Sequence, residues 1–253
     1  MLSRRELLRA AILGATAAVV AACGATAPST RPPTAEPTEP PSPSPGGIPT
    51  RVVPSPTVAT DNAPPQPSLR DKIAGLIVVG FRGATLDEAP WLPAALRDKG
   101  LRGVILFDRD QITGKQRNVI SPRQVTRLIH NLRAAAPSRE IVVSIDQEGG
   151  VVTRLSPAHG FPAVASQATI GRGTVAAARG WANGLTATLA SVGVNLNFAP
   201  VVDLNVNPRS AAIGALGRSF SADPDVVVAM ATTEIEAHGE RQIRTAIKHF
   251  PGI

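Results

Sequence analysis

The sequence predicts an α/β fold in which short parallel strands alternate with helices. Five apolar stretches have the length and composition of buried strands: residues 73–81, 101–107, 141–148, 193–204 and 244–250. Four stretches between them have helical periodicity: residues 88–97, 122–136, 175–192 and 224–242. Strands that are apolar on both faces and separated by amphipathic helices are typical of a parallel sheet covered by helices.

The polar residues that follow the strands favour a barrel over a doubly wound sheet. They lie at the carboxyl ends of the last three predicted strands: Asp146, Glu148, Asp203, Asn205, Lys248 and His249. These positions are carboxyl ends of strands, which is the face where barrel enzymes build their sites. A nucleotide-binding sheet would need a glycine-rich turn after its first strand, where only Gly80 and Gly83 occur. We therefore expect a (β/α)8 TIM-type barrel, with about five of the eight β/α units in this chain.

Residues 1–23 predict a lipoprotein export signal. Three arginines, at positions 4, 5 and 9, precede an uncharged apolar run from 10 to 22 that is too short to span a bilayer comfortably. The pair Arg4-Arg5 resembles a twin-arginine signal, and the Sec route stays open. Cys23 is the only cysteine, so no internal disulfide forms, and "VAAC" before Gly24 resembles the bacterial lipobox. The alternative is an incidental thiol; the lipobox implies an acylated, membrane-anchored protein outside the cytoplasm.

Residues 24–67 predict a disordered, proline-rich stalk between the anchor and the domain. Fourteen of the chain's 24 prolines lie between Pro28 and Pro67. In polyproline II, which rises about 3.1 Å per residue, such a segment reaches roughly 100 Å. The remaining residues, 68–253, form the predicted barrel domain.

Charge and histidine spacing exclude two classes of function. The net charge is +7, but there is no Lys/Arg-rich run and no interleaved aromatic residue, so we expect no nucleic-acid partner. A diffuse basic surface suits anionic wall polymers or lipids better. His130, His159 and His238 lack metal-ligand spacing, and we expect no metal.

Four motifs together resemble a known family. "SIDQEGGVVTRL", "VNLNFAPVVDLN", "IGALGRSFSADP" and "IKHFPG" occur in the order and approximate spacing of glycoside hydrolase family 3, particularly its bacterial β-N-acetylhexosaminidase branch. The similarity extends from about Leu69 to Gly252. It implies a (β/α)8 barrel that needs no cofactor and removes terminal β-linked N-acetylglucosamine, typically from cell-wall fragments.

The resemblance also implies which residues bind the sugar. Asp146 would accept hydrogen bonds from two adjacent hydroxyls, and charge-assisted bonds of this kind are strong. Arg154 and Arg218 match sugar-binding positions, and Lys248 and His249 match a pair that contacts the hydroxyls. Taken alone, a strand-end acid can cap a turn, an arginine can be a surface residue, and a histidine on an apolar strand can belong to the core.

Neighbouring residues have less direct expected roles. Glu148 is expected either to face the sugar or to pair with Arg154 and only orient it. Asp203 is expected to be structural and to connect loops above the fourth strand. Gly149 and Gly150 would let the backbone turn beneath the substrate.

The chain departs from the family after the last motif. By resemblance the nucleophile is an aspartate on a later strand, and the acid/base is a His-Asp pair on the loop that follows "KHFPG". Ile253 stands where the branch usually has a histidine. We therefore expect the chain to be the N-terminal part of an enzyme, without catalytic residues of its own and without hydrolytic activity by itself.

Other functions remain as alternatives. A β-glucosidase is the second substrate assignment within the family. A non-catalytic sugar-binding lipoprotein is less favoured, because such modules stack sugars on Trp or Tyr. This chain has no Tyr, and Trp91 and Trp181 fall in predicted helices. A scaffold lipoprotein would have no need for the retained polar residues.

Overall fold

The computed structural model describes residues 66–136 and 140–253, which belong to one compact unit. The predicted export signal, Cys23 and the predicted stalk up to residue 65 lie outside the described residues. Within the described ranges, no helix has both the length and the apolar character needed to cross a membrane.

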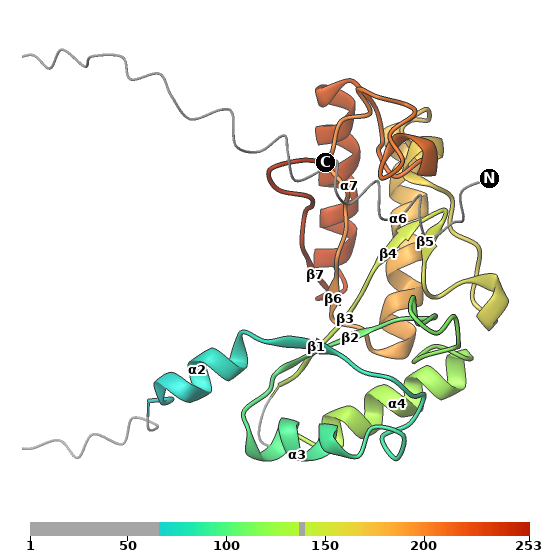
Figure 1. Ribbon diagram of the computed structural model, residues 1–253. Coiled ribbons are helices and arrows are strands. Elements are labelled where there is room, and N and C mark those ends of the chain that lie inside the picture. Colours follow the sequence, from blue (N-terminus) through green and yellow to red (C-terminus); the bar gives the residue numbers. More distant parts are fainter. Residues whose placement is uncertain (1–65, 137–139) are drawn as a thin grey trace, which may run out of the picture. The chain divides into compact units, whose positions relative to one another are not determined.

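The centre of the fold is a parallel sheet whose strands follow one another in sequence order (Figure 1). Its five strands are β1 (Val78–Gly80), β2 (Gly103–Leu106), β3 (Val142–Ile145), β6 (Leu196–Asn197) and β7 (Arg244–Thr245). Each strand pairs in parallel with the next, for example with Val104 opposite Val143. A doubly wound sheet reverses its strand order at a switch point, whereas a β/α barrel does not. The observed order is that of a barrel, as predicted.

Helices connect these strands. They are α2 (Leu69–Gly75), α3 (Trp91–Asp98), α4 (Pro122–Ala134), α5 (Gln167–Ile170), α6 (Val175–Val192) and α7 (Pro224–Gly239). Side chains cap the long ones: Ser121 accepts a hydrogen bond from the Gln124 amide at the start of α4, and Thr174 accepts one from the Ala177 amide at the start of α6. Such caps satisfy backbone donors that lack partners within the helix.

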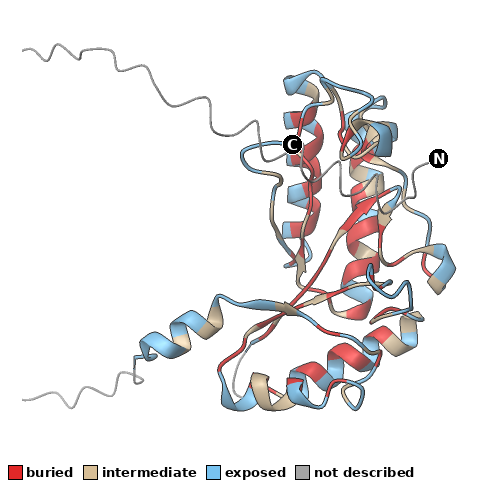
Figure 2. Ribbon diagram, viewed as in Figure 1, coloured by how far each residue is buried: buried red, intermediate tan, exposed pale blue. Residues whose placement is uncertain are grey.

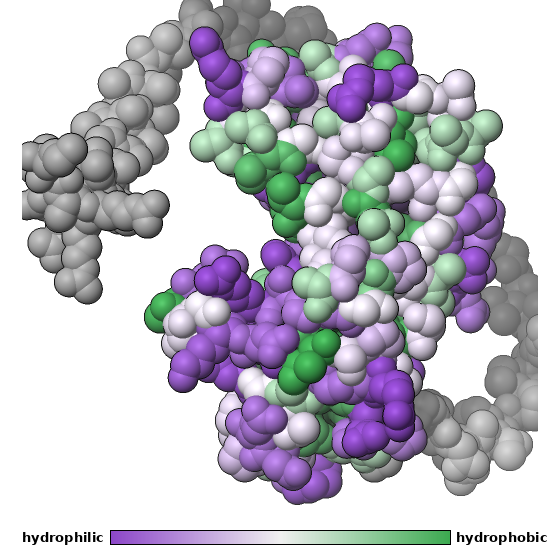
Figure 3. All heavy atoms as spheres, turned by 90° about the vertical axis from the view of Figure 1, so that its right-hand side faces the viewer, coloured by the Kyte–Doolittle hydropathy of each residue, from purple (hydrophilic) through white to green (hydrophobic). Residues whose placement is uncertain are grey.

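Two apolar clusters form the core between the sheet and its helices. In the larger one, buried residues of β2 and β3 meet one face of α4, which Figure 2 shows as a stripe of buried residues on the helix. The smaller one lies between α6 and α7, where Trp181 meets Phe220 edge to face at 6.1 Å between ring centroids. Burying one such side chain stabilises a fold by about 1.5–3 kcal/mol. On the face shown in Figure 3, hydrophobic residues lie in small separate areas among hydrophilic ones.

The strand predictions need correction at their ends. The first predicted strand, 73–81, is wrong at its start, because residues 73–75 belong to α2 and the strand covers only 78–80. The predicted strands 193–204 and 244–250 shrink to 196–197 and 244–245, with an isolated bridge between Val201 and Lys248 beyond them. The helix predictions hold within three residues at each end. The hairpin of β4 (Gln147–Gly149) and β5 (Val152–Thr153) was not expected, because it interrupts the predicted third strand.

Candidate functional site

All five predicted sugar-binding residues line one cavity of about 470 Å³ at the carboxyl ends of the strands. Asp146 follows β3, Arg154 follows β5, and Lys248 and His249 follow β7. Arg218 comes from the loop before α7. The complete lining is Ile105, Asp146, Glu148, Val152, Arg154, Phe198, Arg218, Lys248 and His249.

Asp146 lies between two cations and keeps acceptor capacity. Lys248 Nζ donates to Asp146 Oδ1 at 2.7 Å, and Arg154 Nη2 lies 3.7 Å from Asp146 Oδ2. The Asp146 side chain is 18% exposed. A carboxylate has about four lone-pair sites, so one short hydrogen bond leaves most of them available to a ligand's hydroxyl groups.

Glu148 is a buried counter-ion for two cations. Arg218 binds it through two parallel hydrogen bonds of 2.8 Å each, and Lys248 Nζ lies 2.7 Å from its Oε1. The Glu148 side chain is only 1% exposed, and its hydrogen bonds raise the pKa of the Arg218 guanidinium. The expected pairing of Glu148 with Arg154 is therefore wrong. Sequence spacing could not indicate the true partner, because Arg218 is 70 positions away.

Arg154 instead faces two aspartates and an aromatic ring. Its Nη1 lies 3.6 Å from Asp108 Oδ1, and its guanidinium carbon lies 5.6 Å from the centroid of the Phe107 ring. Its Nε is buried and has no hydrogen-bond partner among the described residues. A buried donor without a partner is costly, and the described residues leave this cost at Arg154 uncompensated. Asp108 was missed at the sequence level, although it follows β2 as Asp146 follows β3.

His249 is held at both ring nitrogens. Its Nε2 lies 3.1 Å from Arg218 Nη2, and a guanidinium can only donate, so Nε2 is the acceptor. The hydrogen therefore sits on Nδ1, which donates to Asp203 Oδ2 at 2.6 Å. Asp203 Oδ1 also accepts from the Ile253 amide at 3.0 Å, which confirms that Asp203 connects loops. A hydrogen bond from a sugar to His249 would have to replace the one with Arg218.

The two adjacent glycines of the first motif shape the hairpin. Gly149 and Gly150 have φ angles of +92° and +62°, so the backbone turns as expected. The close approach is to the chain itself, because a Cβ on Gly149 would lie 2.3 Å from the Ala165 carbonyl oxygen. A Cβ on Gly150 would lie 2.7 Å from the Ser166 Cβ. The glycines thus seat the hairpin against residues 165–166.

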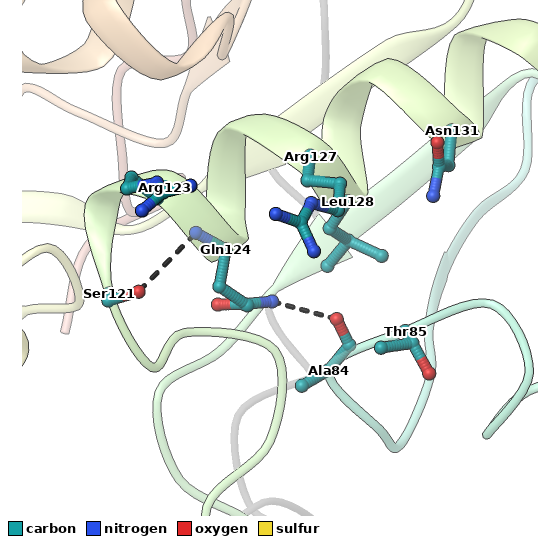
Figure 4. A pocket seen from close by; sticks show the side chains of 8 residues that line it. All are labelled: Ala84, Thr85, Ser121, Arg123, Gln124, Arg127, Leu128 and Asn131. Carbon is teal, nitrogen blue, oxygen red and sulfur yellow. Dashed lines mark hydrogen bonds between the residues drawn. The ribbon is translucent and has the colours of Figure 1, made fainter.

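A second cavity, of about 320 Å³, lies between α4 and the segment at residues 84–85. Figure 4 shows its lining: Ala84, Thr85, Ser121, Arg123, Gln124, Arg127, Leu128 and Asn131. Gln124 Nε2 donates to the Ala84 carbonyl oxygen at 2.8 Å and so ties the helix to the loop. This lining contains no carboxylate. Two carboxylates, Asp146 and Glu148, line the first cavity together with their cationic partners, and that cavity is the candidate site.

No cluster suited to a metal ion occurs among residues 66–136 and 140–253, where no group of three or more His, Cys, Asp or Glu side chains has the required arrangement. The charges of the candidate site are matched to one another: the three cations Arg154, Arg218 and Lys248 face the three carboxylates Asp108, Asp146 and Glu148. A fourth carboxylate, that of Asp203, accepts a hydrogen bond from His249.

Sequence comparison finds named proteins that are similar to this chain. The β-hexosaminidase of Xanthomonas euvesicatoria pv. vesicatoria (strain 85-10) is 37% identical over 187 residues, which cover 70% of this chain and 50% of that protein. The β-hexosaminidase of Xylella fastidiosa (strain M12) is 34% identical over 186 residues, with the same coverage. The chain thus spans about half the length of the curated relatives it matches.

Solved structures agree with this comparison. A glycoside hydrolase family 3 β-N-acetylglucosaminidase from Paenibacillus sp. str. FPU-7 superposes with a TM-score of 0.65 at 29% identity, over 74% of this chain and 34% of that chain. A β-N-acetylhexosaminidase from Beutenbergia cavernae DSM 12333 gives a TM-score of 0.63 at 28% identity, over 74% of this chain and 55% of that chain. The family model described as the glycosyl hydrolase family 3 N terminal domain matches residues 68–253. The resemblance seen in the four motifs is therefore confirmed, and the chain belongs to glycosyl hydrolase family 3.

Proposed function

We propose that the protein functions as a β-N-acetylhexosaminidase-type glycosidase and that the cavity at Asp146 binds the terminal N-acetylglucosamine. The observation that carries this proposal is the convergence of Asp146, Arg154 and Lys248 in one cavity at the carboxyl ends of the strands. The names of the relatives, β-hexosaminidase and β-N-acetylglucosaminidase, support the sugar class.

The chemistry of the cavity suits an amino sugar. Asp146 offers an anionic acceptor to vicinal hydroxyls, and Lys248 offers a cationic donor beside it. Arg154 adds a cationic guanidinium to the lining of the same cavity, which suits a carbonyl oxygen such as that of an N-acetyl group. Glu148 and Arg218 hold these groups in place through their paired hydrogen bonds.

The described residues supply binding groups, and we assign none of them as nucleophile or acid/base. Retaining glycosidases generally use two carboxyl groups about 5 Å apart on either side of the scissile bond. Asp146 and Glu148 both contact the same Lys248 ammonium group, and Glu148 is almost fully buried. Glu148 therefore positions cations, and Asp146 is assigned as a binding group for the sugar hydroxyls.

Titration calorimetry with N-acetylglucosamine tests the proposal. The protein should bind the sugar, and Asp146→Asn should weaken binding by tenfold or more, because losing a charged hydrogen-bond partner costs about 1.5–3 kcal/mol. Asp98→Asn, at an exposed position on α3, is the control and should bind like the parent. Equal affinity in parent and Asp146→Asn would refute the assigned role. Tighter binding of glucose than of N-acetylglucosamine would favour the β-glucosidase alternative.

We also propose that the protein is anchored in the cell envelope through an acylated Cys23 and acts on amino-sugar glycans there. Support comes from the sequence of the first 23 residues, with its basic start, apolar run and "VAAC". The proline-rich segment up to residue 67 would give the domain reach away from the membrane.

A further inference from the structure

A chain of hydrogen bonds runs from helix α7 to the sugar site through buried polar side chains. His238 Nε2 lies 3.1 Å from Asn197 Nδ2. Asn197 in turn holds both backbone groups of Gln147: its Nδ2 donates to the Gln147 carbonyl oxygen and its Oδ1 accepts from the Gln147 amide, each at 3.0 Å. Gln147 stands between Asp146 and Glu148 in the chain. We propose that His238 is a positioning residue of the sugar site, which acts through Asn197 on Gln147 and the two flanking carboxylates.

The geometry fixes the role of every polar atom in this chain. Because Asn197 Oδ1 faces an N–H and Nδ2 faces a carbonyl of Gln147, the amide cannot be flipped without losing both bonds. Its Nδ2 can only donate, so His238 Nε2 must accept. His238 Nδ1 faces the Glu234 carbonyl oxygen at 2.8 Å and must carry the hydrogen. The ring is therefore neutral, in agreement with its burial, which lowers the pKa of His238.

Gln147 extends the connection to the other side of the site. Its Nε2 donates to the Leu155 carbonyl oxygen at 3.1 Å, and its Oε1 accepts from the Leu155 amide at 3.0 Å. Leu155 directly follows Arg154. Through one residue, the hydrogen bonds thus fix the backbone next to Asp146 and Glu148 and the backbone next to Arg154.

An apolar side chain at position 238 would fill the space but not replace this function. The side chains of Asn197, His238 and Gln147 are all fully buried, so bulk water does not reach them. Without the His238 acceptor, one N–H of Asn197 is left unsatisfied in the interior. The Asn197 side chain can then rotate away from Gln147 to find another acceptor for this N–H. Gln147 would lose its hydrogen bonds to Asn197, and the backbone of Asp146 and Glu148 would become more mobile.

The inference rests on the proposed function where sugar binding is concerned, and its test has readouts that do not depend on the sugar. In the parent, ¹⁵N NMR of the His238 ring should show the Nδ1–H form with an accepting Nε2. In His238→Leu, the Gln147 amide resonance should shift and its hydrogen exchange should become faster. The affinity for N-acetylglucosamine should fall about tenfold, which corresponds to the loss of one buried hydrogen bond.

Two further variants separate positioning from general packing. His238→Gln offers an amide oxygen to Asn197 and an amide N–H to the Glu234 carbonyl, and should restore the Gln147 resonance and the affinity toward parent values. Val227→Ala removes a buried apolar group from the same helix, away from the network, and should leave both unchanged.

Several outcomes would overturn the inference. In the parent, the His238 ring could be found in the opposite tautomer or charged at neutral pH. The Gln147 amide resonance could stay unchanged in His238→Leu, or Val227→Ala could change it as much as His238→Leu does. The NMR result on the parent decides the matter even if His238→Leu does not fold. A parent that shows the expected tautomer and amide response but binds no sugar would refute the proposed function and leave the positioning of Gln147 intact.

Discussion

The single buried carboxylate of Glu148 compensates two cations, so Glu148 contributes to the stability of the fold as well as to the site. Arg218 and Lys248 both lie within 2.8 Å of its oxygens. Removing one member of a buried ion cluster leaves uncompensated charge, which typically costs about 3–5 kcal/mol. We expect Glu148→Ala to lower the free energy of unfolding by this order in denaturant titrations.

The control for Glu148 is a carboxylate in an exposed ion pair. Asp98 pairs with Arg97 on α3, and their side chains are 49% and 59% exposed. Exposed pairs contribute at most about 1 kcal/mol, so Asp98→Ala should change stability little. A similar loss in both variants would contradict the role of burial at Glu148.

The identities of the site residues could be predicted from sequence, but not their partners. The strand pattern indicated that Asp146, Lys248 and His249 end strands on one face, and the resemblance of the four motifs implied that they bind the sugar. The pairing of Glu148 with Arg218 depends on where a loop 70 positions later returns to the sheet, and no local pattern encodes that. For the same reason the link from Asn197 to His238 was invisible in the sequence.

Among the elements, the β4–β5 hairpin depends on its glycines. A Gly→Ala substitution in this hairpin should destabilise the protein, whereas a Gly→Ala substitution in α6 should stabilise it. Gly149→Ala requires a positive φ and places a Cβ 2.3 Å from a backbone oxygen, so it should destabilise by at least about 1–3 kcal/mol. Gly184→Ala lies on an exposed face of α6 with nothing within 4 Å of the new Cβ. It should stabilise by about 0.5–1 kcal/mol. Thermal unfolding of both variants measures this, and an equal sign for the two would contradict it.

Helix α7 carries a buried acid, Glu234, whose effect on the free energy of unfolding should depend on pH. Both oxygens of Glu234 are buried without a partner among the described residues, and burial, followed by the nearby Glu148, raises its pKa well above the usual 4.5. The folded state therefore keeps this proton while the unfolded state loses it as the pH rises above about 4.5. Stability contributed by the protonated form is present below that pH and is lost as the pH rises toward the folded pKa.

Glu234→Gln removes this titration and keeps a similar shape. The variant should be more stable than the parent at neutral pH, and the difference should shrink as the pH falls toward 4.5. Urea titrations over this pH range measure the difference. A constant difference across the range would show that Glu234 is not held protonated in the folded protein.

Long helices with clear capping residues were easier to predict than short strands. The predicted helix at 175–192 coincides with α6, because Thr174 caps its start and Gly193, with a φ of +89°, ends it. The first predicted strand was wrong at its start because an apolar run gives no period of its own, and Ser68 caps a helix there. Strands at 193–204 and 244–250 were predicted too long, because their later residues leave the sheet to reach the site.

At the scale of the whole molecule, the sequential strand order explains why the site can be assembled from distant segments. Asp146 and Lys248 are 102 positions apart and yet lie 2.7 Å apart, since each follows a parallel strand whose carboxyl end opens on the same face. The fold class could therefore be predicted together with the position of the site. The network behind the site depends on side chains of α7 and β6 meeting in the interior, which only the packed structure reveals.

The attachment of the protein to a membrane is a prediction for the intact chain. Cys23→Ala should either release the protein from the membrane fraction or leave it unprocessed, because cleavage and acylation both require the thiol of "VAAC". Each buried CH₂ of an acyl chain contributes about 0.8 kcal/mol, so several acyl chains on one cysteine hold the protein firmly in the membrane.

A net charge of +7 could also bind the protein to anionic lipids. Membranes should therefore be washed in about 1 M salt, where the screening length is only about 3 Å and charge alone no longer holds a protein. Retention of the parent and release of Cys23→Ala under this wash is the expected result; a fully processed Cys23→Ala protein that stays on washed membranes would contradict the lipid anchor.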